Sequence, residues 1–181
     1  MGVGIADGRG EVHEVKEGDT AIVVDALRAS ATVAALLHAG ANEVTPVAEV
    51  PPDGVGGAVL VGEREGETLE EAALGNSPTE VKERASEVSG ADVVLRTTNG
   101  TNCVKRVERA KRVYMGSLVN LSSLVDSVER SVQDGDIWVV PAGRRGDVAQ
   151  EDVYTANRIL SRLIEKGYGA KSPETVTPES R

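Results

Sequence analysis

The sequence of 181 residues contains no phenylalanine, a single cysteine and only two histidines. Because Cys103 is the only cysteine, an intrachain disulfide and a zinc site built on several cysteines are excluded. His13 and His38 are too few for a multi-histidine metal site, and a histidine-based catalytic triad is not expected. The chemistry that the chain has in quantity is carboxylate, with 29 aspartate and glutamate residues.

The sequence also lacks a long apolar stretch. The longest uncharged run near the N-terminus, residues 29–42, is too short and too polar to cross a bilayer. The first ten residues are rich in glycine and have neither a basic start nor an apolar run, so they do not resemble a secretion signal. We therefore expect a cytoplasmic protein with no membrane partner.

Positive charge is the other quantity in short supply. The 20 lysine and arginine residues are outnumbered by the acids, and the net charge is −9. Such a chain repels the phosphate backbone, so we expect no nucleic-acid partner, although a local basic pocket stays compatible with this charge. The sequence leaves a homo-oligomer open.

The apolar share of 40% is typical of a folded chain, and the length suits one domain, which we place at residues 1–170. Residues 171–181 are rich in Pro, Ser, Thr and Glu and are predicted to be a disordered tail.

Short apolar runs, most of them rich in valine, alternate with segments of helical periodicity. Six runs are predicted to be buried strands: Ala21–Val24, Glu43–Val47, Ala58–Val61, Asp92–Leu95, Arg112–Met115 and Asp136–Pro141. The predicted helices are Ala29–His38, Thr79–Val88, Thr101–Ala110, Leu121–Val132 and Val148–Glu165. This alternation predicts an α/β fold of three layers, α/β/α, with a mostly parallel sheet. Ligands of such folds bind at the carboxyl ends of the strands.

Polar residues follow the first of these strands. Asp25 and Arg28 lie between its end and the next helix, and Ser30 is a good N-cap residue. One interpretation is an anion site at the helix N-terminus, with Asp25 binding a metal or attacking phosphorus. The alternative is a structural pair of Asp25 and Arg28 beside an ordinary cap.

A second acid and base follow the third strand. Glu63 and Arg64 stand directly after Gly62, and they form either a site or a polar turn. Downstream, Asn76 and Ser77 precede Pro78, where either side chain can cap a helix that begins at the proline.

The stretch after the fourth strand is the most informative. Thr98, Asn99, Gly100 and Thr101 combine hydroxyl, amide and backbone donors at a helix start, which is typical of a phosphate cradle. The alternative is an Asn-Gly turn with a capping threonine. Cys103 follows closely, but with no histidine near it in sequence it is interpreted as a buried structural thiol.

Later strand ends add further polar groups. Asn120 is interpreted as a ligand or an N-cap, Gly143 follows the last strand, and Glu151 and Asp152 begin the final helix. A site built on carboxylates, without histidine or cysteine clusters, favours Mg²⁺ over zinc or copper.

Six blocks of the sequence resemble, in order, those of the 2-phosphosulfolactate phosphatase family, and the resemblance covers roughly residues 21–163. The blocks are Val-Val-Asp-Ala-Leu-Arg-Ala-Ser (23–30), Gly-Glu-Arg (62–64), Leu-Gly-Asn-Ser-Pro (74–78), Thr-Thr-Asn-Gly-Thr (97–101), Gly-Ser-Leu-Val-Asn (116–120) and Ala-Gly with Glu-Asp (142, 143, 151, 152).

The resemblance implies an α/β/α fold and a Mg²⁺-dependent phosphatase that hydrolyses 2-phosphosulfolactate, or a related 2-phospho-hydroxycarboxylate, to sulfolactate and phosphate in coenzyme M biosynthesis. The substrate is then a small polyanionic phosphomonoester. Catalysis is assigned to Asp25, Arg28 and Glu63, and metal binding to Asp25, Glu63, Glu151 and Asp152. Substrate binding is assigned to a larger set: Ser30, Arg64, Asn76, Ser77, Thr98, Asn99, Gly100, Thr101, Asn120 and Gly143. Arg64, Arg144 and Arg145 are the cations expected to receive a carboxylate and a sulfonate.

The sequence departs from the family pattern in three places. The family usually continues for several tens of residues beyond the final helix, residues 51–54 replace most of a helix, and Ala72-Ala73 stand where an aromatic residue and an acid are common. The short C-terminus and Ala72-Ala73 favour the alternative function, a non-catalytic anion-binding or scaffold protein that retains the phosphatase fold.

Overall fold

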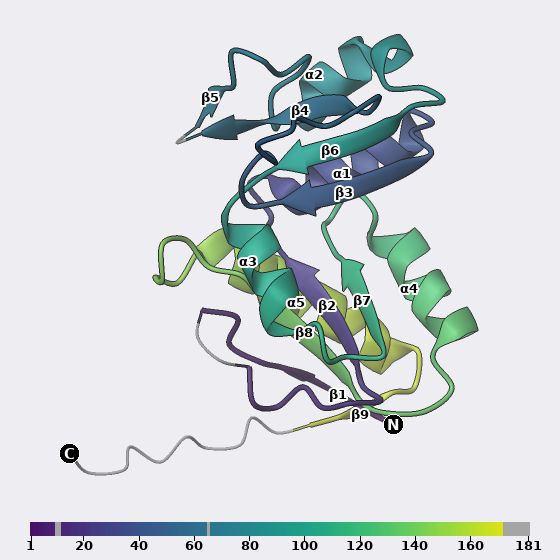
Figure 1. The fold of residues 1–181 in the computed structure, drawn as a ribbon. Coiled ribbons are helices and arrows are strands. Elements are labelled where there is room, and N and C mark those ends of the chain that lie inside the picture. The colour runs from purple at the N-terminus through teal and green to yellow at the C-terminus, as the bar shows by residue number, and fades with distance from the viewer. Residues whose placement is uncertain (10–11, 65, 172–181) are drawn as a thin grey trace, which may run out of the picture.

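The computed structural model describes residues 1–9, 12–64 and 66–171, and their strands form two separate sheets (Figure 1). The larger sheet has five strands in the order β7 (Arg112–Met115), β2 (Thr20–Val24), β8 (Ile137–Pro141), β1 (Gly2–Ile5) and β9 (Gly169–Ala170). All neighbouring strands in it are parallel.

Both faces of the five-stranded sheet are covered. Ile22 and Val24 of β2 face a core cluster with α4 (Leu121–Ser131) and α5 (Gln150–Glu165). Their neighbours Ala21 and Val23 face a second cluster with α3 (Asn99–Arg106) and with Val12 and Val15. Because successive strand residues point to opposite faces and both faces are covered, β2 is apolar from Ala21 to Val24, and all five of its residues are buried.

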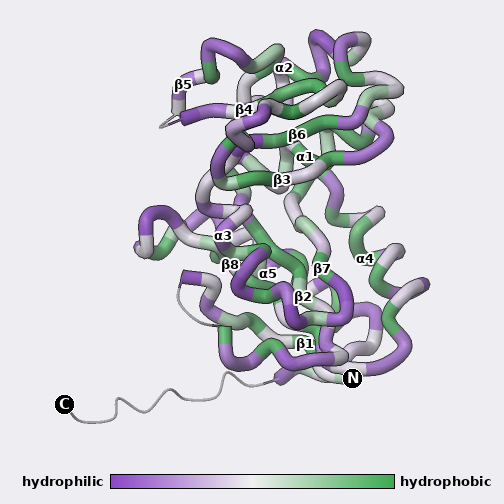
Figure 2. Tube along the Cα trace, viewed as in Figure 1, coloured by the Kyte–Doolittle hydropathy of each residue, from purple (hydrophilic) through white to green (hydrophobic). Residues whose placement is uncertain are grey.

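The smaller sheet has the order β3 (Glu43–Val47), β6 (Asp92–Arg96), β4 (Val59–Arg64) and β5 (Glu67–Thr68). The first three strands are parallel and β5 is antiparallel to β4. Its core lies against α1 (Ala29–His38) and α2 (Pro78–Glu83), followed by the short 3₁₀ helix η1 (Ala85–Glu87). Figure 2 shows apolar segments in the strands of both sheets and hydrophilic segments at many of the turns.

The structure confirms the α/β class, the mostly parallel pairing and all six predicted strands. It differs in that the strands divide between two sheets. In β6, Val93 and Leu95 face the core cluster with α1 and α2, whereas Asp92, the first residue of the strand, is exposed. Core clusters cover both faces of the five-stranded sheet, so the predicted three-layer arrangement applies to that sheet.

Three short strands, β1, β5 and β9, are absent from the sequence-based prediction. In β1 the alternation Gly-Val-Gly-Ile conceals the strand, because glycine disfavours strands. Gly4 is required there, since a Cβ atom would lie 2.8 Å from the ring of Trp138 on the neighbouring strand.

The described chain ends in an ordered residue. Lys171 donates its backbone N–H to Val3, and its amine lies 4.8 Å from the centre of the Trp138 ring. The rest of the predicted disordered tail, residues 172–181, lies outside the described residues. The single domain at residues 1–170 stays a prediction. Within the described residues, no helix combines the length and apolar character needed to cross a bilayer.

Candidate active site

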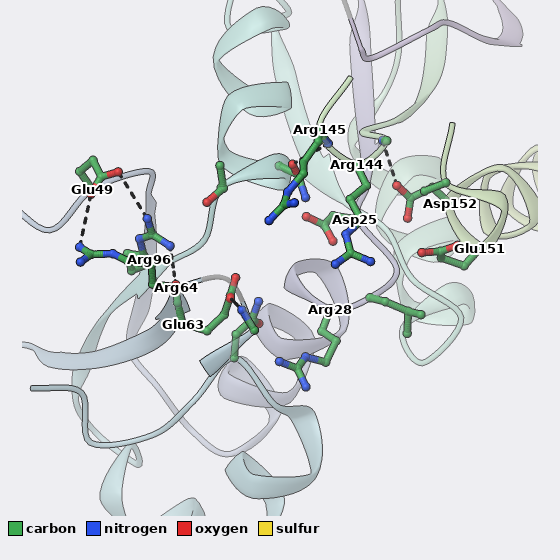
Figure 3. A pocket seen from close by; sticks show the side chains of 17 residues that line it. Asp25, Arg28, Glu49, Glu63, Arg64, Arg96, Arg144, Arg145, Glu151 and Asp152 are labelled. Atoms are coloured by element: carbon green, nitrogen blue, oxygen red, sulfur yellow. Dashed lines mark hydrogen bonds and ion pairs between the residues drawn. The ribbon is translucent and has the colours of Figure 1, made fainter. Parts of the chain in front are cut away.

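Loops that follow five strands, drawn from both sheets, meet around one cavity of about 660 Å³ (Figure 3). These loops follow β2 and β8 in the larger sheet and β3, β4 and β6 in the smaller one. The expectation that strand ends converge is thus met across two sheets. The predicted residues that line the cavity are Asp25, Arg28, Glu63, Arg64, Asn76, Thr98, Asn99, Gly143, Arg144, Arg145, Glu151 and Asp152.

Asp25 is the first residue after β2 and lies 6% exposed in the wall of the cavity. Its Oδ2 accepts a hydrogen bond of 2.7 Å from the backbone N–H of Gly100. Burial, helped by the charges of Asp152 and Glu63, raises the pKa of Asp25 to about 6, against the backbone hydrogen bonds from Gly100 and Ala29, which lower it. The site thus holds a carboxylate whose ionised form is disfavoured by its surroundings.

Asp152, the third residue of α5, is 2% exposed and connects two loops of the larger sheet. Its two oxygens accept the backbone N–H groups of Ala26 (2.7 Å) and Gly143 (3.0 Å). Burial raises the pKa of Asp152, while these two hydrogen bonds lower it. Gly143 is suited to this turn because its φ is +70° and a Cβ atom would lie 2.5 Å from the Asp147 carbonyl oxygen.

The predicted phosphate cradle is only partly open to the cavity. Helix α3 begins at Asn99, and Thr98 and Asn99 line the cavity. Gly100 instead directs its N–H to Asp25, and a Cβ atom at this position would lie 3.0 Å from the Asp25 carboxylate. Thr101 is buried and outside the lining, and its hydroxyl has no partner.

Three arginines approach Asp25 from two directions. Arg144 and Arg145 extend from the loop after β8, and Arg28 lies just before α1 (Figure 3). All three are exposed residues in the lining. In the described part of the chain, no ion pair is formed by Arg28 or by Arg144, so both remain available to an anionic ligand.

Several predicted ligands have structural roles. Ser30 lies inside α1 and is not its cap; its Oγ accepts the Asp25 backbone N–H at 3.0 Å. Ser77 caps α2 by accepting the Glu80 N–H. Asn120 neither lines the cavity nor caps α4 with its side chain, because its amide is bonded to Ser117 and Met115.

Two charged residues of the cavity were not among the predicted ligands, Glu49 after β3 and Arg96 at the end of β6. Arg96 is 5% exposed and donates to the carbonyl oxygen of Glu63 and to the Glu49 carboxylate. Gly62 lets Arg96 pack here, because a Cβ at residue 62 would lie 2.7 Å from Arg96 Cβ. The same strand-end rule, applied to β3, would have found Glu49.

The four predicted metal-binding carboxylates do not form one cluster. Among the described residues, no group of three or more histidine, cysteine, aspartate or glutamate side chains is arranged to hold a metal ion. Glu63 is committed elsewhere, because its Oε2 accepts the Gly66 N–H. Asp25 and Asp152 are the two of the four that are buried, and the charge of Asp152 raises the pKa of Asp25.

Cys103 is not part of the cavity lining. Its side chain is fully buried in the core beside α3, and burial raises the pKa of the thiol to about 12. A thiol with so high a pKa is not a nucleophile at neutral pH, which agrees with the structural role expected from the sequence.

Comparison with known proteins supports the assignment suggested by these strand ends. The family model described as 2-phosphosulpholactate phosphatase matches residues 9–177. The chain belongs to this family. A probable 2-phosphosulfolactate phosphatase of Thermotoga petrophila is 36% identical over 160 residues, which are 86% of this chain and 68% of the relative.

Other members of the 2-phosphosulfolactate phosphatase family give similar values. The probable enzyme of Deinococcus radiodurans is 38% identical over 155 residues, 82% of this chain and 63% of the relative. That of Picosynechococcus is 36% identical over 157 residues, 80% of this chain and 62% of the relative. The matched part therefore spans about two thirds of the length of these curated relatives.

Proposed function

We propose that this chain is a Mg²⁺-dependent phosphatase that hydrolyses a small polyanionic phosphomonoester, 2-phosphosulfolactate or a related 2-phospho-hydroxycarboxylate. The observation that carries the proposal is one cavity in which two buried carboxylates, Asp25 and Asp152, lie opposite the arginines Arg28 and Arg144. Such a site offers a place for a cation and a place for a phosphoryl group side by side.

The chemistry of the carboxylate pair fits Mg²⁺. Proteins commonly bind this ion through one or two carboxylates, and water and substrate phosphate complete its six ligands. Burial, together with the neighbouring charge of Asp152, disfavours the ionised form of Asp25 and raises its pKa to about 6, so a bound cation would stabilise this carboxylate. We assign the cation to Asp25 and Asp152, with Glu151 at its edge. Glu63 is left out of this ligand set, because its carboxylate accepts the Gly66 N–H.

The arginines and the start of α3 would hold the phosphoryl group. Arg28 and Arg144 would neutralise its oxygens, and the hydroxyl of Thr98 with the amide of Asn99 would orient it. Bound Mg²⁺ would supply charge neutralisation at a phosphoryl oxygen and a water of lowered pKa.

In the reaction the water oxygen forms a new bond to phosphorus and the ester P–O bond breaks. The leaving oxygen takes up a proton and becomes the hydroxyl of the product. Asp25 could instead attack phosphorus directly. We favour the water route, because the residue two positions after Asp25 is Leu27 and not the second aspartate of the Asp-x-Asp pair typical of phosphatases that form an aspartyl-phosphate.

The wider biological setting follows from the family alone. We propose that the product is sulfolactate, that the reaction serves coenzyme M biosynthesis or another route that uses 2-hydroxy acids, and that it takes place in the cytoplasm.

Release of inorganic phosphate tests the proposal. The chain is incubated with 2-phosphosulfolactate, phospholactate and phosphoglycolate, in Mg²⁺ or in EDTA. Release that requires Mg²⁺ is expected, and the three rates rank the substrates. No release from any of them, together with a raised melting temperature in their presence, would instead establish the non-catalytic anion-binding protein.

A further inference from the structure

Two arginines at the end of the cavity away from Asp25 share one carboxylate, that of Glu49 (Figure 3). Glu49 Oε1 lies 3.3 Å from Arg96 Nη2, and Glu49 Oε2 lies 3.9 Å from Arg64 Nη2. All three residues follow or end strands of the smaller sheet. One carboxylate thus contacts both guanidinium groups, one oxygen to each.

Arg96 is a buried cation with too few partners. Its side chain is 6% exposed, whereas that of Glu49 is 75% exposed. Nη1 donates to the Glu63 carbonyl oxygen, Nη2 makes the long contact with Glu49, and the buried Nε has no hydrogen-bond partner. A buried guanidinium is stabilised by closely bonded anions, and a carboxylate so exposed holds it weakly.

We propose that Arg96 and Arg64 form a second anion subsite, which takes the carboxylate or sulfonate of the substrate, and that Glu49 fills this subsite until the ligand displaces it. The proposal rests on the proposed function, in which the phosphoryl group lies at the Asp25 end of the same cavity. Glu49 is then a specificity residue that occupies the place of the ligand's acid group.

The exposure of Glu49 makes the exchange feasible. The Glu49 carboxylate is open to water and salt, its contact with the exposed Arg64 is long and its hydrogen bond to the buried Arg96 is single, so a small anion can compete with it. The incoming acid group would bring two or three oxygens to the same two guanidinium groups, with shorter, charge-assisted hydrogen bonds. A phosphomonoester without a second acid group would leave Glu49 in its place.

Binding of 3-sulfolactate, which carries a carboxylate and a sulfonate but no phosphoryl group, tests the subsite by calorimetry. In Glu49→Gln the amide oxygen can still accept from Arg96, but the competing charge is gone. We expect this variant to bind 3-sulfolactate roughly 3- to 5-fold more tightly than the wild type, as the loss of a weak ion pair with one exposed partner implies.

Glu43→Gln is the matched control. Glu43 begins β3, is exposed and lies outside the cavity lining, so its replacement removes the same charge from the other end of the strand. This variant is expected to stay within about twofold of the wild type. Affinity of Glu49→Gln equal to or below that of the wild type, or an equal gain in both variants, would overturn the subsite.

A second variant fixes the location of the bound acid. Arg64→Gln, introduced into Glu49→Gln, is expected to remove the gain, since Arg64 is exposed and its loss does not disturb the core. A gain that survives this change would contradict the proposal. Because the readout is binding, it is independent of turnover: a chain that releases no phosphate would refute the proposed function, and one that turns over without tightening in Glu49→Gln would refute only the subsite.

Discussion

The two sheets bring opposite electrostatics to the same cavity. On the side of the five-stranded sheet, Asp25 and Asp152 are buried and their oxygens accept backbone N–H groups. On the side of the four-stranded sheet the buried charge is Arg96, and its carboxylate partner Glu49 is exposed. The buried charges that line the cavity are therefore negative on the larger sheet and positive on the smaller one.

This difference follows from how the strand ends are covered. The loop after β2 is enclosed by α3, by α5 and by the loop after β8, so its carboxylate is desolvated. The loop after β3 has no such cover, and Glu49 reaches Arg96 from solvent. The cavity between the two sheets therefore has a buried acidic end and, at the other end, an ion pair whose carboxylate is exposed to solvent.

The largest effect is expected from Asp25→Asn. The variant keeps an oxygen for the Gly100 N–H but removes the negative charge, so phosphate release should fall by about 10³-fold or more. Asp126→Asn, an exposed change on α4, is the control and should retain the wild-type rate. A rate for Asp25→Asn within about tenfold of the wild type would place the site elsewhere.

The stability of the metal-free protein should depend on pH through Asp25. Its folded-state pKa of about 6 lies above the ordinary 3.8, so the folded chain holds a proton that the unfolded chain releases. The contribution of Asp25 is therefore full below about pH 4 and is lost as the pH rises to about 6, by roughly 3 kcal/mol in all.

Comparison of wild type and Asp25→Asn isolates this contribution from the other carboxylates. Thermal melts in EDTA should show that the variant gains on the wild type between pH 4.5 and pH 7.5, by several degrees. An equal difference between the two proteins at both pH values would contradict a raised pKa of Asp25.

A smaller effect is expected on the other sheet from Gly62→Ala. The added Cβ would lie 2.7 Å from both Cβ and the carbonyl oxygen of Arg96, so β4 and β6 must move apart. We expect a loss of about 1–3 kcal/mol in unfolding free energy, measured by urea titration. Gly57→Ala, where a Cβ meets nothing within 4 Å, is the control, and equal losses in both variants would show that the contact is not tight.

The smallest effect is expected from Cys103→Ala. The rate of phosphate release should stay within about twofold, because the buried thiol does not reach the cavity. The lost packing should cost about 1 kcal/mol in a thermal melt. A large loss of rate at unchanged stability would return the thiol to the list of catalytic groups.

The sequence predicted the parts of this site that follow a single strand. Asp25, Thr98 and Gly143 were found because polar residues after buried strands are unusual, and the structure places them in one cavity. The division into two sheets was not predictable, because the order in which strands pair depends on packing between distant segments. Arg96 illustrates the same limit. It stands just before the predicted cradle in the sequence, but its side chain donates to Glu63 and Glu49 of the smaller sheet.

Hydrogen-bond partners were the least predictable feature. Gly100 and Ser30 carry the residue types of a phosphate cradle, and both serve to fix Asp25 instead. Asn120 has the type of a ligand, but its amide holds the turn after β7. A donor next to a strand end can bond the chain or a ligand, and only the three-dimensional arrangement decides between them.

The most direct test of the cation site is the shift in melting temperature caused by Mg²⁺ with inorganic phosphate at pH 8. At about 100 times the dissociation constant, we expect a stabilisation of about 3 kcal/mol for the wild type and for Asp126→Asn, and less than a third of it for Asp25→Asn. An equal shift in Asp25→Asn would contradict the claim that the buried carboxylates of the larger sheet hold the ion.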